Sequence, residues 1–260
     1  MFWDVLNEVR LGVRSEDTET YIQSLERYLS ACSSEPVHIF FRKLPALMFN
    51  LLALQRLPGQ FLKYVSIDEN NTSNISCPAD EIIMMKPGCK VMHLWNTSNE
   101  LHNGTLGVFL GAAQGNALKV LFPGIGTRMI NRETWLKKDR EGTIVGKRMQ
   151  YPLALAYAIT CHKSQGMTLD AAVVHGSDEF VPGLYYVAMS RVRSPQNLQV
   201  LGFNKKHITK PGESLEMRIN FVDYANVNEG GRTVFFLFLT FFALKICSNT
   251  INSMVPIWIC

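Results

Sequence analysis

The sequence predicts an α/β fold, and three observations support that class. Residues 36-PVHIFF-41 form a β-branched and aromatic run that is typical of a buried strand, and a helical pattern over 44–57 follows it. Short apolar runs over 89–95, 105–112 and 117–122 are separated by turn signals and indicate further strands. After residue 170 the order strand, helix, strand returns, which is the alternation expected of an α/β protein.

The first 35 residues are predicted to be helical. A polar break over 14–19 separates a first helical pattern from a second one over 20–32. The later helix over 44–57 is expected to end at Pro58-Gly59, because neither residue favours a continuing helix. In the first pattern the apolar residues near helical spacing are Phe2, Val5, Leu6, Val9 and Leu11.

The middle of the chain predicts a small barrel or a meander of strands. A polar loop over 66–76 leads into the three short strands, and Asn103-Gly104, Gly115-Asn116 and Pro123-Gly124 mark the turns around them. Strands this short and closely spaced fit a small closed or meandering sheet. The charged stretch 131–148 is expected to be an exposed connection.

The run 151-YPLALAYAITCHKSQG-166 is predicted to be one helix. Pro152 stands where a helix would begin and Gly166 where it would end. Such a helix would place Thr160, Lys163 and Ser164 on one face, at positions i, i+3 and i+4.

The remaining elements are predicted to be a strand, a helix and a strand. The strands cover 171–176 and 198–203, and the helix covers 182–195 with its end at Ser194-Pro195. Its apolar face consists of Tyr185, Ala188, Met189 and Val192. This places Arg191 and Arg193 in the last turns of the helix.

Two polar groups could serve phosphate chemistry. His162, Lys163, Ser164 and Gln165 offer one cation and several hydrogen-bond donors at one point, which suits phosphate or sugar oxygens. An arginine held by a rigid helix, as predicted for Arg191, suits the charge of a transferring phosphoryl group. The alternative for both is a solvated helix end without a ligand, where a basic residue or a glycine completes the helix.

Composition limits the classes of protein. The net charge of +4 is compatible with a polyanionic partner but is too small to indicate nucleic acid by itself. The six cysteines are scattered without a CxxC pair, so they suggest neither a zinc site nor a disulfide framework, and no metal site is expected. A reducing compartment within the cell is the expectation, and the N-terminus lacks the pattern of a signal peptide.

The C-terminal part contains an apolar block, 233-TVFFLFLTFFALKIC-247. A membrane-spanning helix needs roughly 20 apolar residues, so this block is short for that role. A buried tail is favoured over a membrane anchor, and a membrane-tethered interaction protein is the weakest of the functional readings.

Two stretches, 152–174 and 182–203, carry a specific resemblance. With 161-CHKSQGMTLD-170 and 187-VAMSR-191, they resemble in order and spacing the fifth and sixth motifs of the Pif and RecD-like superfamily-one DNA helicases. The segment 86–110, with its VM pair and NG turn, resembles the segment that these helicases carry before those motifs. Residues 3–12 and 37–59 look like the start of their second RecA-like domain.

The resemblance implies a more detailed fold. It implies an α/β, RecA-like, P-loop-type second motor domain with an inserted small SH3-like β-barrel. Its parts would be the first portion of the RecA-like domain (1–85), the barrel and a connection (86–150), the remainder with motifs five and six (151–210), and a tail (211–260).

The resemblance also implies roles for individual residues. Arg191 would be the catalytic arginine finger that faces the ATP γ-phosphate, and Gln165 and Gly166 would lie near the nucleotide. The residues that would hold the DNA backbone or transmit the nucleotide state to it are His162, Lys163, Ser164 and Thr168. The family couples ATP hydrolysis, with Mg, to five-prime to three-prime movement on single-stranded DNA, in DNA repair, recombination and telomere maintenance.

The sequence departs from that family in one important respect. It contains no GxxxxGK loop followed by Ser or Thr, since its Gly146-Lys147 pair is followed by Arg148. The first ATP-binding domain is therefore expected to be missing, and the chain alone is predicted to bind no ATP or Mg, hydrolyse no ATP and unwind no DNA.

Two functions follow from this gap. The favoured one is the C-terminal portion of a helicase of the nucleus or mitochondrion, which needs the missing domain in trans or in a longer chain. The rival is a stand-alone module, derived from a helicase, that binds single-stranded nucleic acid or regulates another protein.

Overall fold

The computed structural model describes the chain except for residues 14, 30–34, 99, 177–182 and 209–260. The predicted tail and its apolar block therefore lie outside the described residues. The chain divides into two compact units, one formed by residues 1–42 and 160 onward, the other by residues 43–159. Among the residues described, no helix has both the length and the hydropathy needed to cross a bilayer.

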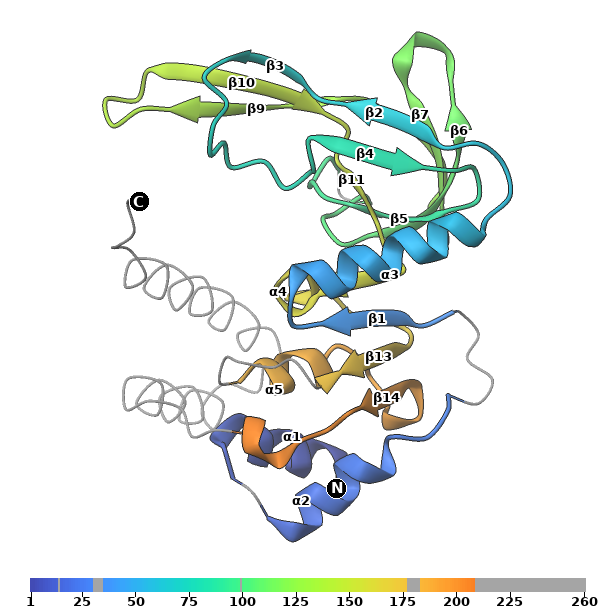
Figure 1. Cartoon of the computed structure of the whole chain (residues 1–260), viewed down its shortest axis with the longest axis vertical. Helices are drawn as coiled ribbons and strands as arrows, with labels where there is room; N and C mark the ends of the chain where they lie inside the picture. Colours follow the sequence, from blue (N-terminus) through green and yellow to red (C-terminus); the bar gives the residue numbers. More distant parts are fainter. Residues whose placement is uncertain (14, 30–34, 99, 177–182, 209–260) are drawn as a thin grey trace, which may run out of the picture. The chain divides into compact units, whose positions relative to one another are not determined.

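The first unit contains the strands β1, β13 and β14 (Figure 1), which belong to a sheet of the order β12-β1-β13-β14. Strand β1 (Val37–Phe40) pairs in parallel with β13 (Ala172–His175), which pairs in parallel with β14 (Leu198–Leu201). The chain returns from the second unit to the first at Thr160, the last residue of β12 (Ala158–Thr160). Parallel strands covered by helices are buried on both faces, which accounts for their continuous β-branched runs.

Helices of the first unit present apolar faces to its core. Helix α1 (Phe2–Leu11) buries Phe2, Val5, Leu6 and Val9, and it ends at Gly12, whose φ of 71° lies in the left-handed region. It packs against α2 (Glu16–Ser24) and α5 (Leu184–Met189). Ser15 caps α2 because its Oγ accepts a hydrogen bond from the Thr18 N–H at 3.1 Å.

The second unit combines one long helix with three antiparallel sheets. Helix α3 spans Lys43–Arg56, and a 3-10 turn covers Gln114–Asn116. Two further 3-10 turns, Pro195–Asn197 and Lys205–His207, belong to the first unit. The sheets have the orders β3-β10-β9, β11-β5-β6-β7-β8 and β2-β4. Their strands are β2 (Leu62–Val65), β3 (Ile67–Asn70), β4 (Ile82–Met85), β5 (Lys90–His93), β6 (Leu106–Ala112), β7 (Leu118–Phe122), β8 (Gly126–Ile130), β9 (Glu133–Lys138), β10 (Ile144–Gln150) and β11 (Leu153–Leu155).

Close packing in the five-stranded sheet depends on one glycine. A Cβ on Gly107 of β6 would lie 2.7 Å from the ring of Phe122 on β7, so only glycine lets the two strands approach. Phe109 and Phe122 are fully buried in this core together with Leu118 and Val120. The β6–β7 register shifts between Phe109 and Gly111, which marks a β-bulge.

All six strands predicted from the sequence are confirmed. Those expected over 36–41, 89–95, 105–112, 117–122, 171–176 and 198–203 are present as β1, β5, β6, β7, β13 and β14, and the helix expected over 44–57 is α3. The strands are predicted from apolar or β-branched runs, and the helix from its stop at Pro58-Gly59. These patterns depend only on neighbouring residues, and the conformation that they predict is the one found in the folded chain.

The single helix predicted over 151–166 is wrong. The segment forms β11, β12 and then the short helix α4 (Cys161–Ser164). Residues Leu153–Leu155 pair antiparallel with Val91–His93 of β5. An apolar run of this kind fits a buried strand and a buried helix equally, so only the pairing partner decides its conformation.

The other corrections concern charged segments and helix ends. The stretch predicted as an exposed connection, 131–148, contains β9 and most of β10, and the polar loop 66–76 contains β3, which pairs with β10. The expected break over 14–19 contains the start of α2, since Ser15 caps it. The helix predicted over 182–195 ends at Met189, so Arg191 and Arg193 lie beyond α5 and not in its last turns.

Candidate functional site

A short polar turn follows β12 in the first unit. Thr160 is the N-cap of α4, and its Oγ1 accepts a hydrogen bond from the Lys163 N–H at 3.4 Å. Ser164 is fully buried, and its Oγ donates to the Cys161 carbonyl at 2.7 Å. Cys161 is also buried, and its Sγ donates to the Leu184 carbonyl at 3.4 Å, which ties α4 to α5. The turn is therefore anchored from inside.

Gly166 reverses the chain directly after α4. Its φ of 77° is in the left-handed region, where a side chain would be strained. The Met167 N–H then donates to the Ser164 carbonyl at 3.1 Å and closes a tight loop. Residues 164–167, which we call the motif loop, consequently present two carbonyl oxygens toward the end of α5.

Arg191 connects the motif loop to the end of α5. Its Nη1 donates to the carbonyls of Ser164 and Met167, both at 3.4 Å. Its Nε donates to the Val187 carbonyl at 2.7 Å, and its Nη2 donates to Ser190 Oγ at 2.8 Å. The two segments that resemble helicase motifs, separated by more than 20 residues in the sequence, thus meet at one guanidinium group.

The backbone reinforces this connection. The Leu169 N–H donates to the Arg191 carbonyl at 2.9 Å, and Leu169 forms an isolated parallel bridge with Val192. Arg191 is only 7% exposed, and burial lowers the pKa of its guanidinium from the usual value. The acceptors of these four side-chain hydrogen bonds are neutral oxygens, which orient the guanidinium group.

The other predicted site residues divide into exposed and buried ones. Lys163, Gly166 and Thr168 are exposed, whereas His162 and Gln165 are half-buried. Ser164 does not lie on the surface where a DNA contact was expected, because its hydroxyl is buried and donates to the Cys161 carbonyl. The face expected for Thr160, Lys163 and Ser164 does not form, since Thr160 caps the helix while Lys163 and Ser164 have opposite exposure.

Sequence reasoning missed two residues that build this turn. The helix predicted over 151–166 places Thr160 on a face with Lys163 and Ser164, and the scattered cysteines indicate no role for Cys161. A Thr followed by a short polar helix is an N-cap pattern, which could have identified Thr160. No local signal marks the contact of Cys161 with Leu184, because it depends on the packing of α4 on α5.

Comparison with known proteins identifies the relatives of this chain. No protein-family model matches it. Human ATP-dependent DNA helicase PIF1 is 33% identical over 212 residues, which are 78% of this chain and 33% of that protein. The crystal structure of Pif1 helicase from Candida albicans superposes with a TM-score of 0.73 at 29% identity, over 85% of this chain and 57% of that one.

A third match is a Pif1 structure that contains single-stranded DNA. Bacteroides Pif1 bound to single-stranded DNA matches with a TM-score of 0.68 at 31% identity, over 88% of this chain and 54% of that one. The chain is a homologue of part of the Pif1 helicases. The match covers 33% to 48% of the length of the human, Xenopus laevis and Bdellovibrio bacteriovorus Pif1 helicases, and the chain shares the mixed α/β fold of the Pif1 structures.

The residues present do not by themselves fit the nucleotide for which the Pif1 relatives are named. A phosphate-cradling loop of the type GxxxxGK followed by Ser or Thr is absent from all 260 residues. Arg191 directs its donors to oxygens of its own chain. Within the described ranges, no three His, Cys, Asp or Glu side chains are grouped so that they could hold a metal ion.

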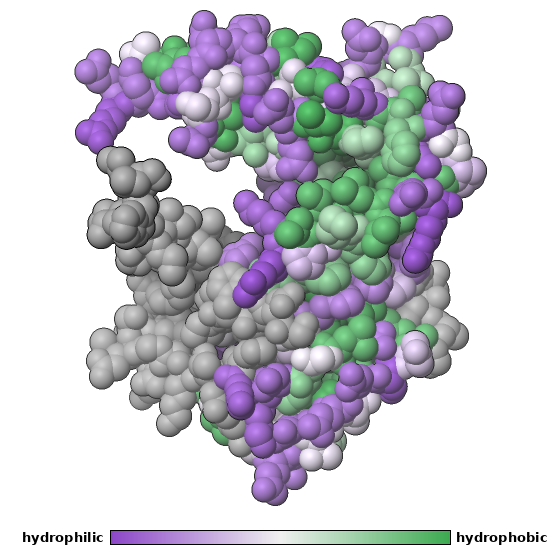
Figure 2. Space-filling model, viewed as in Figure 1, coloured by the Kyte–Doolittle hydropathy of each residue, from purple (hydrophilic) through white to green (hydrophobic). Residues whose placement is uncertain are grey.

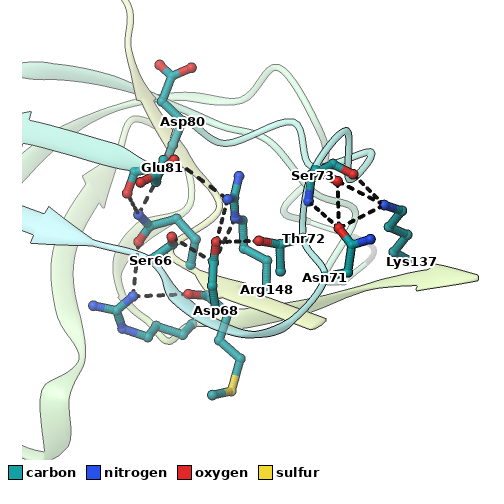
Figure 3. A network of polar contacts seen from close by, with 12 residues as sticks. Ser66, Asp68, Asn71, Thr72, Ser73, Asp80, Glu81, Lys137 and Arg148 are labelled. Atoms are coloured by element: carbon teal, nitrogen blue, oxygen red, sulfur yellow. Dashed lines mark hydrogen bonds and ion pairs between the residues drawn. The ribbon is translucent and has the colours of Figure 1, made fainter. Parts of the chain in front are cut away.

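A second polar network lies on β3 and β10 in the second unit (Figure 3). Arg148 donates from Nε to Asp68 Oδ1 at 2.8 Å and from Nη2 to Oδ2, and Asp68 also accepts from the hydroxyls of Ser66 and Thr72. The hydrogen bonds from Arg148 hold the pKa of Asp68 well below its usual value. Arg148 is paired with a carboxylate, so this network joins strands and is not a free cation site.

Proposed function

We propose that this chain is the C-terminal portion of an ATP-dependent, five-prime to three-prime DNA helicase that is inactive without an ATP-binding domain. In the proposed arrangement its second unit contains an inserted SH3-like barrel and its first unit is a RecA-like domain. The observation that carries the proposal is the set of hydrogen bonds from Arg191 to the motif loop. They couple a candidate γ-phosphate sensor to a candidate DNA contact.

The coupling would work through the backbone. An anion that attracts the Arg191 guanidinium competes with the carbonyls of Ser164 and Met167 for its donors. Loss of these two long hydrogen bonds would release the motif loop, which lies between exposed Lys163 and exposed Thr168. Nucleotide state would then reach the DNA contact, with ATP and Mg held mainly by the domain that supplies the phosphate loop.

Single-stranded DNA is the proposed partner. Lys163 is an exposed cation whose backbone is fixed by the Thr160 cap, and half-buried His162 lies beside it. Contacts of this kind with phosphates give binding that weakens as salt is added, because counterions are released.

The test is binding of a labelled single strand to the purified 260-residue chain, measured by fluorescence anisotropy over a series of salt concentrations. Lys163→Ala is expected to weaken binding on the order of fivefold and to reduce the salt slope by about 0.7, the value for one phosphate contact on a single strand. Lys205→Ala is the matched control, because exposed Lys205 carries the same charge on the same unit and pairs with Glu19 at 3.0 Å. Unchanged binding in both Lys163→Ala and His162→Ala would contradict the DNA role.

ATP hydrolysis is tested separately on the same preparation. The chain alone is expected to hydrolyse no ATP with or without DNA, since it lacks the phosphate loop. DNA-stimulated hydrolysis by the pure chain, abolished by Arg191→Ala, would show that the proposed dependence on a second domain is wrong.

A second candidate is a stand-alone single-stranded nucleic-acid-binding or regulatory module. The missing phosphate loop favours it, because a binding module has no use for one. The mass of the native polypeptide that contains HKSQGMTLD separates the two. A species much larger than 29.4 kDa supports the helicase portion, and a species of 29.4 kDa supports the module.

A further inference from the structure

Two features of the fold have no role in the proposed function. The first is a hydrophobic area over α3 (Figure 2), where Leu44, Leu47 and Leu52 are exposed. These side chains carry neither charge nor hydrogen-bond donors, so they offer a ligand no specific polar contact. The second is a pair of imidazoles in the first unit, His38 and His175, and imidazole nitrogens are metal ligands.

The imidazole pair lies on two neighbouring strands of the parallel sheet (Figure 1). His38 belongs to β1, His175 is the last residue of β13, and the register pairs Phe40 with His175. Because side chains at i and i+2 share one face of a strand, His38 and Phe40 lie on the same face. In open parallel sheets, ligands bind at the carboxyl ends of the strands, and the pair is located near that edge.

The two rings meet nitrogen to nitrogen. His38 Nδ1 and His175 Nε2 are 2.8 Å apart, so one ring donates a hydrogen bond and the other accepts it. The ring centroids are 5.1 Å apart with an interplanar angle of 29°. Both side chains are half-buried, which leaves the pair partly open to solvent and to a small ion.

The surrounding packing fixes the direction of the His175 ring. The ring stacks on Phe40, with centroids 4.0 Å apart and an interplanar angle of 9°. Gly176 follows directly, and a Cβ at that position would overlap with the Tyr185 hydroxyl of α5, so the chain is held closely there. Burial lowers the pKa of His175, so its ring is neutral at neutral pH and has a lone pair to share.

We propose that His38 and His175 form a binding site for a divalent transition metal, with Zn²⁺ as the representative ion. Imidazole nitrogen is a common ligand of Zn²⁺, whereas Mg²⁺ and Ca²⁺ prefer oxygen ligands. Two Zn–N bonds of about 2.0–2.1 Å in a tetrahedral arrangement place the nitrogens about 3.3 Å apart. The rings would therefore separate by only about 0.5 Å from their hydrogen-bonded distance of 2.8 Å.

The metal would take the place of the proton between the two rings. Each facing nitrogen gives its lone pair to the ion, so the ring that donated the hydrogen bond carries its proton on its other nitrogen. Among the described residues no group of three His, Cys, Asp or Glu side chains surrounds an ion, so water would fill the remaining positions. With two protein ligands the Kd is expected to be roughly 10–100 µM, far weaker than that of a structural zinc site.

Two isosteric variants test whether the rings are metal ligands. Asn places an amide atom near the position of His38 Nδ1, and Gln does so for His175 Nε2, so each variant keeps a hydrogen-bonding group but loses a ligand. Zn²⁺ binding to the full 260-residue chain is measured by competition with a chromogenic chelator. His38→Asn and His175→Gln are each expected to weaken binding at least tenfold, while the unfolding temperature of the metal-free chain changes by less than about 4 °C.

The matched control is His102→Gln, because His102 is an exposed histidine of the second unit. This variant should bind Zn²⁺ as tightly as the wild-type chain does. Absence of Zn²⁺ binding by the wild-type chain, or undiminished binding by both pair variants, would overturn the assignment of this site.

A second measurement uses the wild-type chain alone and does not depend on how a variant folds. Diethyl pyrocarbonate modifies accessible imidazoles, and mass spectrometry identifies the modified residues. Zn²⁺ is expected to slow the modification of His38 and His175 severalfold and to leave that of His102 unchanged. Equal protection of all three histidines, or of none, would contradict the site, whatever the outcome of the DNA-binding and ATPase measurements.

Discussion

Two arginines in different units show how the same side chain serves opposite purposes. Arg148 faces the carboxylate of Asp68, and hydrogen bonding to it raises the pKa of Arg148. Arg191 instead faces carbonyl and hydroxyl oxygens, and burial lowers its pKa. The carboxylate of Asp68 offsets the charge of the first group, whereas the carbonyl and hydroxyl oxygens that accept from Arg191 hold the second group between α5 and the motif loop. The segments that each arginine connects, and not the residue type, distinguish the two.

The largest expected effect tests the burial of Arg191. Arg191→Ala would leave the carbonyls of Val187, Ser164 and Met167 without their donor in a buried place. We expect the free energy of unfolding to fall by about 2–4 kcal/mol, measured by urea denaturation. Arg193→Ala is the control, because Arg193 is exposed, and it should change stability by less than about 0.5 kcal/mol. Similar losses in the free energy of unfolding for Arg191→Ala and Arg193→Ala would show that the burial of Arg191 does not stabilise the fold.

A smaller effect is expected for Arg148. Arg148→Ala removes two hydrogen bonds to Asp68, but the side chains of the pair are 14% and 28% exposed, so water partly replaces them. We expect a loss of about 1 kcal/mol in the same denaturation assay. Lys147→Ala is the matched control on the same strand, since its ion pair with Glu69 is more exposed, and it should cost less. A loss as large as that of Arg191→Ala would refute the distinction.

The smallest effect depends on pH. The pKa of Asp68 is lower in the folded chain than its usual value of 3.8, so its charge stabilises the fold above that value. This contribution is lost as the pH falls through the lower folded-state pKa. The stability difference between the wild-type chain and Asp68→Asn should therefore shrink between pH 7 and pH 3, measured from urea midpoints. In an Arg148→Ala background the difference should be small at both pH values.

The contrast between the helices α1 and α3 makes a related point about patterns. Both segments are predicted to be helical, the first from apolar residues near helical spacing and the second from its stop at Pro58-Gly59, and both are helices. In α1 the pattern marks the buried face, with Phe2, Val5, Leu6 and Val9 inside. In α3 the most apolar positions are exposed and the buried face includes Asn50. Periodicity predicts that a helix forms, but it does not say which face its neighbours will cover.

The sequence by itself determined the fold class, the strands β1, β5, β6, β7, β13 and β14, and the family. Runs such as 36–41 and 171–176 are buried strands because β-branched residues in short bounded runs favour that state regardless of their neighbours. The motifs around HKSQGMTLD and VAMSR were sufficient to indicate the Pif1-type helicases, which the relatives confirm. The missing phosphate loop is likewise a property of the sequence alone.

Only the tertiary structure decided how these pieces meet. The segment 151–166 was assigned wrongly because its conformation depends on pairing with β5, which is remote in sequence. Charged strands β3, β9 and β10 were missed because their pairing and the Asp68–Arg148 contact compensate for a polar composition. The meeting of Arg191 with the motif loop depends on the packing of α4 against α5, and interactions between distant segments leave no local pattern in a single sequence.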